Sequence, residues 1–436
     1  MEGNVNTQIV LRSIEDGTPL AASQREIKWT PHWNARSVTA LGCCWLAYVV
    51  VSTESSVLGP FFPSEAGDHG VSSALIGLIF SASPFCVLVF TPLFGYNLAK
   101  LGVKRILMCG TLLAGGSYFI LGFIDYMPPG ASFVSYGLLL QVTQGIGCAM
   151  VSTSGSVLVT SLFQNHYAAM MGLMELAGCV GCTIGPVIGG LLYEFGGFKL
   201  PFLVLGASTV LVSIPLLLVT QDIDPEIEQL SPKAIFKIIG NCSVILVALS
   251  NALATGSIYF FTPTLSPFLM KQFNLSPLYI GLVFIADSIT YMIASVIIGP
   301  LLSHFSTRLL IIVGLLTCGV GFFCIGPIEL IATPQLWIII FSIAIIGFGG
   351  ALVIMVSYAD IMTTAKSLNT SYNTESLSAI TSGIMFSSFS FGELLGPIVG
   401  GALNEIFDFQ TSSMVIGVVI LAQAVLMAIF SVCKCQ

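Results

Sequence analysis

Apolar residues run along this chain in long stretches, without the alternation of polar positions that marks an amphipathic helix or strand. Stretches such as SVTALGCCWLAYVVVST and SSMVIGVVILAQAVLMAIFSV are long enough to cross a lipid bilayer, because the hydrocarbon core requires about 20 residues of helix. Inside lipid the backbone must satisfy its own hydrogen bonds, so these stretches are predicted to be helices. The pattern therefore predicts an all-α membrane protein.

Twelve such stretches are predicted along the chain. We place them at 38–60, 74–98, 106–126, 132–160, 168–194, 201–220, 241–269, 278–302, 309–327, 336–361, 377–404 and 412–432. The polar linker 221–240 separates the sixth span from the seventh. The predicted organisation is a cytosolic tail at 1–37, a six-helix bundle at 38–220, the cytosolic linker, a second six-helix bundle at 241–432 and a cytosolic C-terminus at 433–436.

Composition and charge support this reading and predict an orientation. Hydrophobic residues make up 55% of the chain and charged residues only 8%, whereas soluble proteins carry roughly 25% charged residues. Of the 14 Lys and Arg residues, all except Lys199 and Lys271 fall on the side that holds both predicted termini. Positively charged loops stay in the cytosol, so we predict that both termini are cytosolic. The net charge of −7 says little about partners.

The chain repeats itself. The pattern Gly-Pro-x-x-Gly-Gly-x-Leu-x-Glu begins at Gly185 and again at Gly396, an offset of 211 residues. Gly77 and Gly281 begin a second matching pair of stretches, offset by 204 residues. The repeated motif residues are Gly185, Pro186, Gly189 and Gly190 in the first copy, and Gly396, Pro397, Gly400 and Gly401 in the second. The repeat predicts two halves of related architecture.

The repeated glycines and prolines are interpreted as an interface that moves. Small residues let helix backbones approach closely, and a proline inside a helix removes a backbone hydrogen bond and bends it. Transporters place paired elements of this kind across a pseudo-two-fold axis. The alternative is that the glycines serve tight packing alone.

Two further motifs resemble those of the major facilitator superfamily. The loop GYNLAKLGVKR keeps Gly95, Gly102 and Lys104 of the superfamily pattern but has Ala99 where the family has Asp. The stretch QVTQGIG has Gln141 where the family has Arg. The resemblance implies the twelve-helix major facilitator fold. In the family the missing Asp helps to lock the bundles in one state and the missing Arg is tied to proton coupling, so neither role is carried over.

A closer resemblance covers the chain from the first span to the last. The stretches SSVLGPFFPSEA, YIGLVF and GPVIGGLLYEFGGFKLPFLVLG are similar to the vesicular amine transporter family, most of all to its vesicular polyamine branch. This resemblance implies an antiporter that exchanges lumenal protons for cytosolic amines. It also implies a multi-pass protein of secretory, synaptic or other acidic vesicle membranes.

Acidic residues inside the predicted spans indicate cation chemistry without the resemblance. Apart from Asp125 and Glu194 at span ends, the spans contain five acidic residues and no Lys or Arg, which makes an electronegative interior that attracts cations. Burial without a basic partner favours the protonated carboxyl group, so a proton and a cation would compete for one site. We predict this role for Glu54, Glu175, Asp287 and Glu393, each against the alternative of a buried structural acid. Asp360 is interpreted as a solvated helix end.

Other span residues are candidates for lining a substrate cavity. Tyr259, Tyr291 and Tyr358 would offer ring faces to an ammonium group, an interaction that aromatic rings make with cations. Gln144 and Asn251 would add polar groups. Ordinary helix packing is the alternative for all five.

The sequence shows no nucleotide-binding loop, metal-ligand cluster or nucleophile triad. We therefore expect no enzyme activity, no metal and no cofactor, with a proton gradient as the energy source. The expected partners are a small cationic substrate, protons and the lipid bilayer, without nucleic acid, and the chain is expected to act as a monomer. Two other readings stay open: a plasma-membrane drug/proton antiporter of the same fold, and a transporter-like scaffold that moves no substrate.

Overall fold

The computed structural model describes residues 35–163, 167–219, 237–325, 335–368 and 374–435. The predicted N-terminal tail and most of the linker lie outside these residues. Residues Thr39–Gln436 group into one compact unit, and the description concerns that unit.

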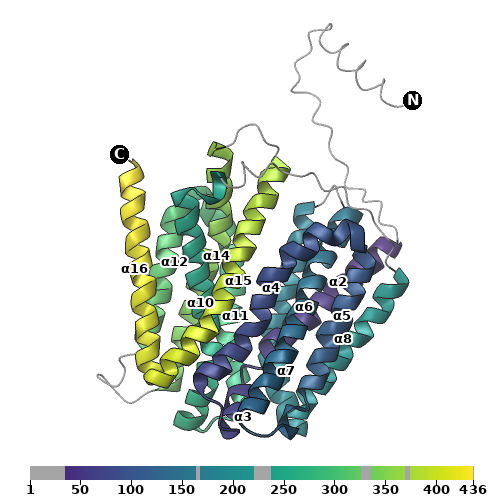
Figure 1. The fold of residues 1–436 in the computed structure, drawn as a ribbon. Coiled ribbons are helices and arrows are strands. Elements are labelled where there is room, and N and C mark those ends of the chain that lie inside the picture. The colour runs from purple at the N-terminus through teal and green to yellow at the C-terminus, as the bar shows by residue number, and fades with distance from the viewer. Residues whose placement is uncertain (1–34, 164–166, 220–236, 326–334, 369–373, 436) are drawn as a thin grey trace, which may run out of the picture. The chain divides into compact units, whose positions relative to one another are not determined.

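The described residues are helical and contain no strand, as the apolar stretches predict (Figure 1). The first six long helices are α2 (Ala35–Val57), α4 (Ser73–Leu101), α5 (Val103–Leu121), α6 (Ala131–Leu162), α7 (Tyr167–Gly196) and α8 (Lys199–Val219). The other six are α10 (Cys242–Phe273), α11 (Pro277–His304), α12 (Thr307–Ile325), α14 (Leu336–Leu368), α15 (Thr374–Ile406) and α16 (Phe409–Cys435). Every predicted span coincides with one of these helices.

Eleven of these described helices are long and apolar enough to cross a membrane by length and composition. The remaining one is α5, which carries Lys104 and Arg105 in its first turn. It packs against α6 and α8, at the position in the chain order that the third predicted span occupies.

Three features differ from the prediction. A short helix, α3 (Phe62–Asp68), follows α2, and the 3-10 turn η2 (Ile124–Tyr126) follows α5. Pro63 lies in the first turn of α3, and the buried rings of Phe61 and Phe62 pack against Phe198. Helix α14 also runs to Leu368, beyond the predicted end at 361. The apolar pattern marks the lipid-spanning length and misses both the polar extension of a helix and short turns.

Each half of the chain buries its own hydrophobic core. Two clusters draw their buried residues from positions 41–216, and a third draws them from positions 238–427. In the third, the ring of Phe261 stacks on that of Phe322, with ring centroids 5.2 Å apart. We call residues 39–219 the first half and residues 237–435 the second half. The domain boundaries themselves stay a prediction.

The repeated glycines lie where helix backbones touch. Within the halves, an added Cβ at Gly185 would lie 2.0 Å from Ser56 Oγ of α2, and one at Gly396 would lie 2.5 Å from the Gly256 carbonyl oxygen of α10. Gly189 faces Val57 of α2 in the same way. Gly400 likewise faces Phe260 of α10. This glycine face of α7 and α15 therefore serves packing within each half.

The second glycine of each pair instead touches the other half. A Cβ at Gly190 of α7 would lie 2.5 Å from the Pro277 carbonyl oxygen of α11, and one at Gly401 of α15 would lie 2.2 Å from the Ser73 carbonyl oxygen of α4. The same holds in reverse for Gly281 and Gly77. Their added Cβ atoms would lie 2.3 and 2.1 Å from the carbonyl oxygens of Pro186 and Pro397, respectively. The repeat thus builds two equivalent contacts, α7 with α11 and α15 with α4.

These contacts between the halves gather at one end of the molecule, which we call the closed end. It is formed by the starts of α4 and α11 and the ends of α7 and α15. Further from the closed end, Ser81 of α4 donates a hydrogen bond of 2.7 Å to the Leu394 carbonyl oxygen of α15. Ser266 of α10 donates to the Pro60 carbonyl oxygen, also across the halves.

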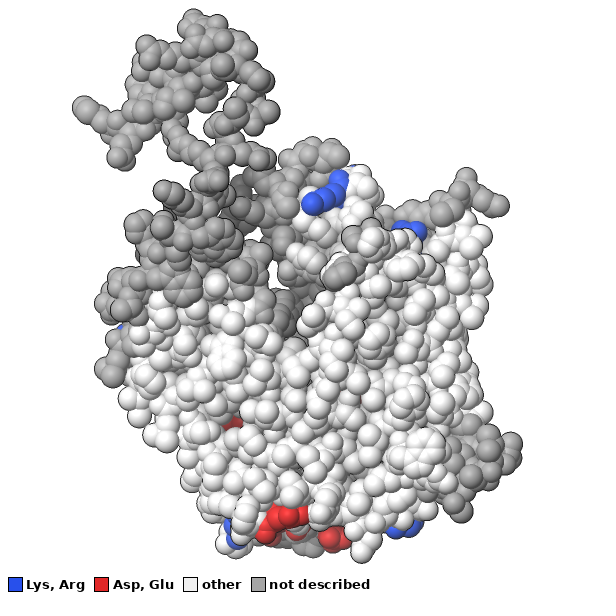
Figure 2. All heavy atoms as spheres, turned by 180° about the vertical axis from the view of Figure 1, so that it is seen from behind, with Lys and Arg blue, Asp and Glu red and all other residues white. Residues whose placement is uncertain are grey.

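Charged side chains mark the two ends. Acidic groups gather at the closed end, whereas basic groups appear at both ends (Figure 2). The described basic residues of that opposite end are Lys100, Lys104, Arg105, Lys237, Arg308 and Lys366, which lie at the matching helix ends. By the distribution of positive charge, the closed end is the non-cytosolic one. This sidedness stays a prediction.

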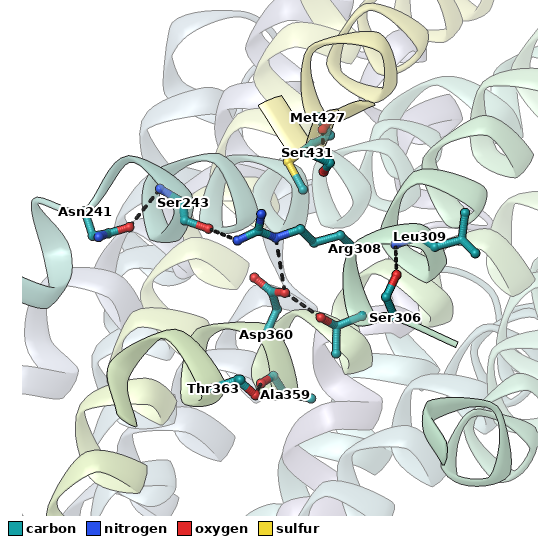
Figure 3. A network of polar contacts seen from close by, with 11 residues as sticks. Asn241, Ser243, Ser306, Arg308, Leu309, Ala359, Asp360, Thr363, Met427 and Ser431 are labelled. Atoms are coloured by element: carbon teal, nitrogen blue, oxygen red, sulfur yellow. Dashed lines mark hydrogen bonds and ion pairs between the residues drawn. The ribbon is translucent and has the colours of Figure 1, made fainter. Parts of the chain in front are cut away.

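Asp360 corrects one sequence interpretation. Its side chain is only 5% exposed, so it is no solvated helix end. Arg308 of α12 lies 3.8 Å from its carboxylate and donates a 2.8 Å hydrogen bond to Ser243 of α10, while Thr307 also donates to Asp360 (Figure 3). The network ties α10, α12 and α14 together. The sequence did not reveal this network, because its residues lie up to 117 positions apart in the chain.

We expect this ion pair to stabilise the second half. Replacing Arg308 with Met leaves the Asp360 carboxylate buried without a counter-charge. The free energy of unfolding should fall by about 2 kcal/mol, between the values for exposed and for fully buried pairs. Tryptophan fluorescence during heating of the purified protein measures the resulting fall in melting temperature. Adding Asp360→Asn to Arg308→Met should recover part of the lost melting temperature, and an unchanged melting temperature in the single variant would contradict the assignment.

Candidate functional site

One cavity lies between the two halves and is lined by polar and aromatic side chains. It is narrow in this conformation, with a volume of about 30 Å³. The first half contributes Glu54, Ser55, Leu58, Phe80, Ser83, Pro84, Gln141 and Gln144, and the second half contributes Tyr259, Thr262, Glu393 and Pro397. Among the predicted site residues, the structure therefore brings Glu54, Glu393, Gln144, Tyr259 and Pro397 together.

Glu54 is the acidic group that the first half presents to this cavity. It lies near the end of α2 and is fully buried. Thr209 of α8 donates a 2.6 Å hydrogen bond to its Oε1 atom, and Gln144 of α6 lies beside the carboxyl group. Its Oε2 atom is buried without a hydrogen-bond partner among the described residues. One oxygen is thus held in place by Thr209, while the other makes no hydrogen bond to the described residues.

Glu393 is its counterpart from the second half. It lies on α15, three residues before the Gly396-Pro397 motif, and is partly buried. Tyr259 of α10 lies beside its carboxyl group. The Tyr259 ring also packs edge-on against Phe389, with centroids 6.3 Å apart. An aromatic ring beside a carboxylate is an arrangement that suits an ammonium group.

Asp287 lies apart from the cavity lining. It is partly buried on α11 and sits against α14, because a Cβ at Gly347 would lie 2.2 Å from its backbone oxygen. Its carboxylate accepts a weak 3.3 Å hydrogen bond from Ser288. It is still close enough to Tyr259 to act on it electrostatically. Asp287 is therefore a neighbour of the site and not part of its wall.

Four other predicted residues lie outside the cavity lining or outside the described side chains. Glu175 belongs to α7, but its side chain lies outside the described part of the chain. Asn251 is fully buried and donates a 2.6 Å hydrogen bond to Ser388, which ties α10 to α15. Tyr291 packs against the core of the second half. The Tyr358 side chain is 36% exposed.

The loop motif between α4 and α5 lies at the end opposite the closed end. Gly102 joins the two helices with a φ of 84°, a left-handed conformation that favours glycine. Lys104 lies in the first turn of α5 and is partly buried. A Cβ added at Gly95 of α4 would make only an ordinary contact, 3.8 Å from the Thr153 side chain. The side chain at Ala99 lies outside the described ones.

Sequence reasoning missed several residues of the site. Thr209, Ser83 and Thr262 each place a hydroxyl group at or beside the cavity. Their signal in the sequence was a single polar residue inside an apolar span, which is too common to identify a site alone. A second missed grouping is Glu65, His69 and Asp125 near the closed end. Their side-chain atoms of the kind that can bind a metal lie within 4.8 Å of one another. Tyr193 donates a 2.9 Å hydrogen bond to Glu65.

Known proteins share the arrangement of the helices. The profile of the Major Facilitator Superfamily matches residues 44–245 and 247–433. The chain belongs to this superfamily. It is therefore a multi-pass membrane transporter and not an enzyme, as the sequence predicts.

Curated relatives within the superfamily confirm the predicted resemblance to vesicular amine transporters. The MFS-type transporter SLC18B1 of Mus musculus is 32% identical over 384 residues, which cover 86% of this chain and 82% of the relative. The synaptic vesicular amine transporter of Homo sapiens is 24% identical over 371 residues, covering 84% of this chain and 68% of the relative.

Solved structures share the fold at low sequence identity. A bacterial homologue of the human lysosomal transporter Spinster, in an inward-facing and occupied conformation, has a TM-score of 0.70 and 17% identity and covers 91% of this chain and 96% of its own. The nucleoside transporter NupG has a TM-score of 0.72 and 12% identity and covers 91% and 98%. At such identities the likeness concerns the fold alone.

Proposed function

We propose that this chain is a proton-coupled antiporter that loads small organic cations, polyamines or monoamines, into an acidic vesicle. The observation that carries the proposal is the Glu54 carboxyl group, which is fully buried with one unpartnered oxygen in a cavity between the halves. Glu393 and Tyr259 line the same cavity from the other half. One relative named above is a synaptic vesicular amine transporter, which supports an amine as the cargo and a vesicle as the location.

The chemistry follows from an uncompensated acidic site. Among the described residues the ion pair is Arg308 with Asp360, and neither residue lines this cavity. A buried carboxylate without a counter-charge is unfavourable, so Glu54 and Glu393 would each hold either a proton or a cationic amine. An amine arriving from the cytosol displaces the proton, and a proton from the acidic lumen displaces the amine. This competition couples the two fluxes.

The proposal includes alternating access. The halves touch at the closed end, which by charge distribution faces the lumen, so this conformation would receive substrate from the cytosol. Helix α15 connects site and closure, since Glu393 lines the cavity and the next residue, Leu394, accepts the hydrogen bond from Ser81. Filling the site can therefore affect the closure through adjacent residues. The energy comes from the proton gradient, with no cofactor, and one copy of the chain contains the whole site.

Uptake into proteoliposomes tests the proposal. Purified protein is reconstituted, an inside-acid gradient is imposed, and radiolabelled spermidine and serotonin are supplied in parallel. We expect uptake of one amine class that collapses when a protonophore removes the gradient. Uptake that ignores the gradient would contradict antiport. The absence of uptake of either amine by folded protein would contradict the amine assignment and favour a scaffold role.

A further inference from the structure

The repeated motif ends in a glutamate whose purpose the cavity does not explain. These residues are Glu194 at the end of α7 and Glu405 at the end of α15, related by the same offset of 211 residues as the glycines. Both side chains are exposed at the closed end and lie outside the cavity lining. Because the repeat preserves a negative charge at this position, we expect both copies to make equivalent contacts.

That contact crosses between the halves in both copies. Glu194 Oε1 of α7 accepts a hydrogen bond from the hydroxyl group of Ser276, which occupies the N-cap position of α11. Glu405 Oε2 of α15 accepts a 3.2 Å hydrogen bond from the backbone N–H of Ala74, in the first turn of α4. We call these two contacts the closed-end latches.

Each latch occupies a helix start that lacks a cap of its own. Ser276 and Ser72 are the N-cap residues of α11 and α4, and neither makes a side-chain capping bond within its helix. The first backbone N–H groups of a helix need acceptors, and a negative charge there is favoured by the helix dipole. Glu405 supplies such an acceptor to α4 from the other half, whereas Glu194 brings its charge to the start of α11 through the Ser276 hydroxyl group. Separation of the halves removes both contacts.

We propose that Glu194 and Glu405 are positioning residues that hold the closed end shut and so set the balance between the two conformations. The neighbouring glycines make the same pair of approaches, Gly190 to the start of α11 and Gly401 to the start of α4. The glycines permit the approach and the glutamates stabilise it. The inference rests on the alternating-access part of the proposed function.

Distance measurement between two spin labels tests the latches without any transport. Labels replace Tyr126 of η2 and Trp337 of α14, two side chains 67% and 66% exposed near the closed end in different halves. The labels are introduced as non-canonical amino acids so that native cysteines remain. No amine or gradient is present, so a failed transport assay and a failed latch are distinguishable.

We expect the double variant Glu194→Ala/Glu405→Ala to raise the ratio of open to closed populations by roughly three- to thirtyfold, the range expected for two lost charge–dipole contacts. Each single variant should give part of that effect. Asp408→Asn is the matched control, because this exposed acid near the same helix end makes no recorded side-chain contact across the halves. It should leave the distance distribution unchanged.

Ser276→Ala offers a second route that leaves both glutamates in place. It removes the donor of one latch and should open the closed end as Glu194→Ala does, with no further effect when the two are combined. An unchanged distance distribution in folded Ser276→Ala and Glu194→Ala/Glu405→Ala proteins would overturn the proposal. So would an equal shift in Asp408→Asn.

Discussion

Replacing Glu54 with Gln is expected to reduce gradient-driven amine uptake by about 100-fold, the loss that follows when one partner of a buried charge contact is removed. Gln matches Glu in size, and its amide oxygen can still accept the hydrogen bond from Thr209 that holds Glu54 Oε1. What it loses is the negative charge and the ability to exchange a proton. The expected loss therefore reports on chemistry and not on packing.

Uptake of the amine into inside-acid proteoliposomes measures this loss. Asp68→Asn serves as the control, since Asp68 is an exposed acid at the end of α3 and is absent from the cavity lining. Wild-type uptake by Glu54→Gln would rule out Glu54 as a coupling group. It would leave Glu393 as the acid in this cavity to be tested in the same way.

Replacing Gly281 with Ala is expected to reduce uptake by at least about tenfold, because it depletes the conformation that receives cytosolic substrate. The added Cβ would lie 2.3 Å from the Pro186 carbonyl oxygen and 2.8 Å from its carbonyl carbon. Both are backbone atoms of another helix and cannot move aside as a side chain would. The two halves must then separate at the closed end.

Gly299→Ala is the matched control on the same helix. A Cβ there meets nothing within 4 Å, so uptake should remain at the wild-type level. Gly77→Ala should repeat the loss, because Gly77 approaches Pro397 in the equivalent contact. Equal uptake in Gly281→Ala and Gly299→Ala, with both proteins eluting as folded monodisperse species, would show that the close approach is not needed for transport.

The repeat places equivalent residues in the two contacts of the closed end. Gly77 with Gly281, Gly190 with Gly401 and Glu194 with Glu405 are three symmetric pairs, and each pair contributes one member to each of two equivalent contacts. Variants within one pair should therefore shift the conformational balance in the same direction. Two halves that can separate and close as units are what alternating access requires.

The sequence alone determined the transmembrane helices, the repeat and the family. Long apolar stretches specify helices because a backbone in lipid has no other way to satisfy its hydrogen bonds. The motifs from Gly185 and Gly396, which the structure places at helix contacts, could be found by comparing the chain with itself. The type of residue at the site was also readable, since an acid such as Glu54 inside an apolar span is unfavourable without a role.

Only the tertiary structure decided which of these residues meet. It placed Glu54 and Glu393 in one cavity, left Asp287 beside it and paired Asp360 with Arg308. The sequence could not decide this because lipid is as apolar as a protein core. A spanning helix therefore shows no contrast between its outer and inner faces, and the direction in which each side chain points is set only when the helices pack.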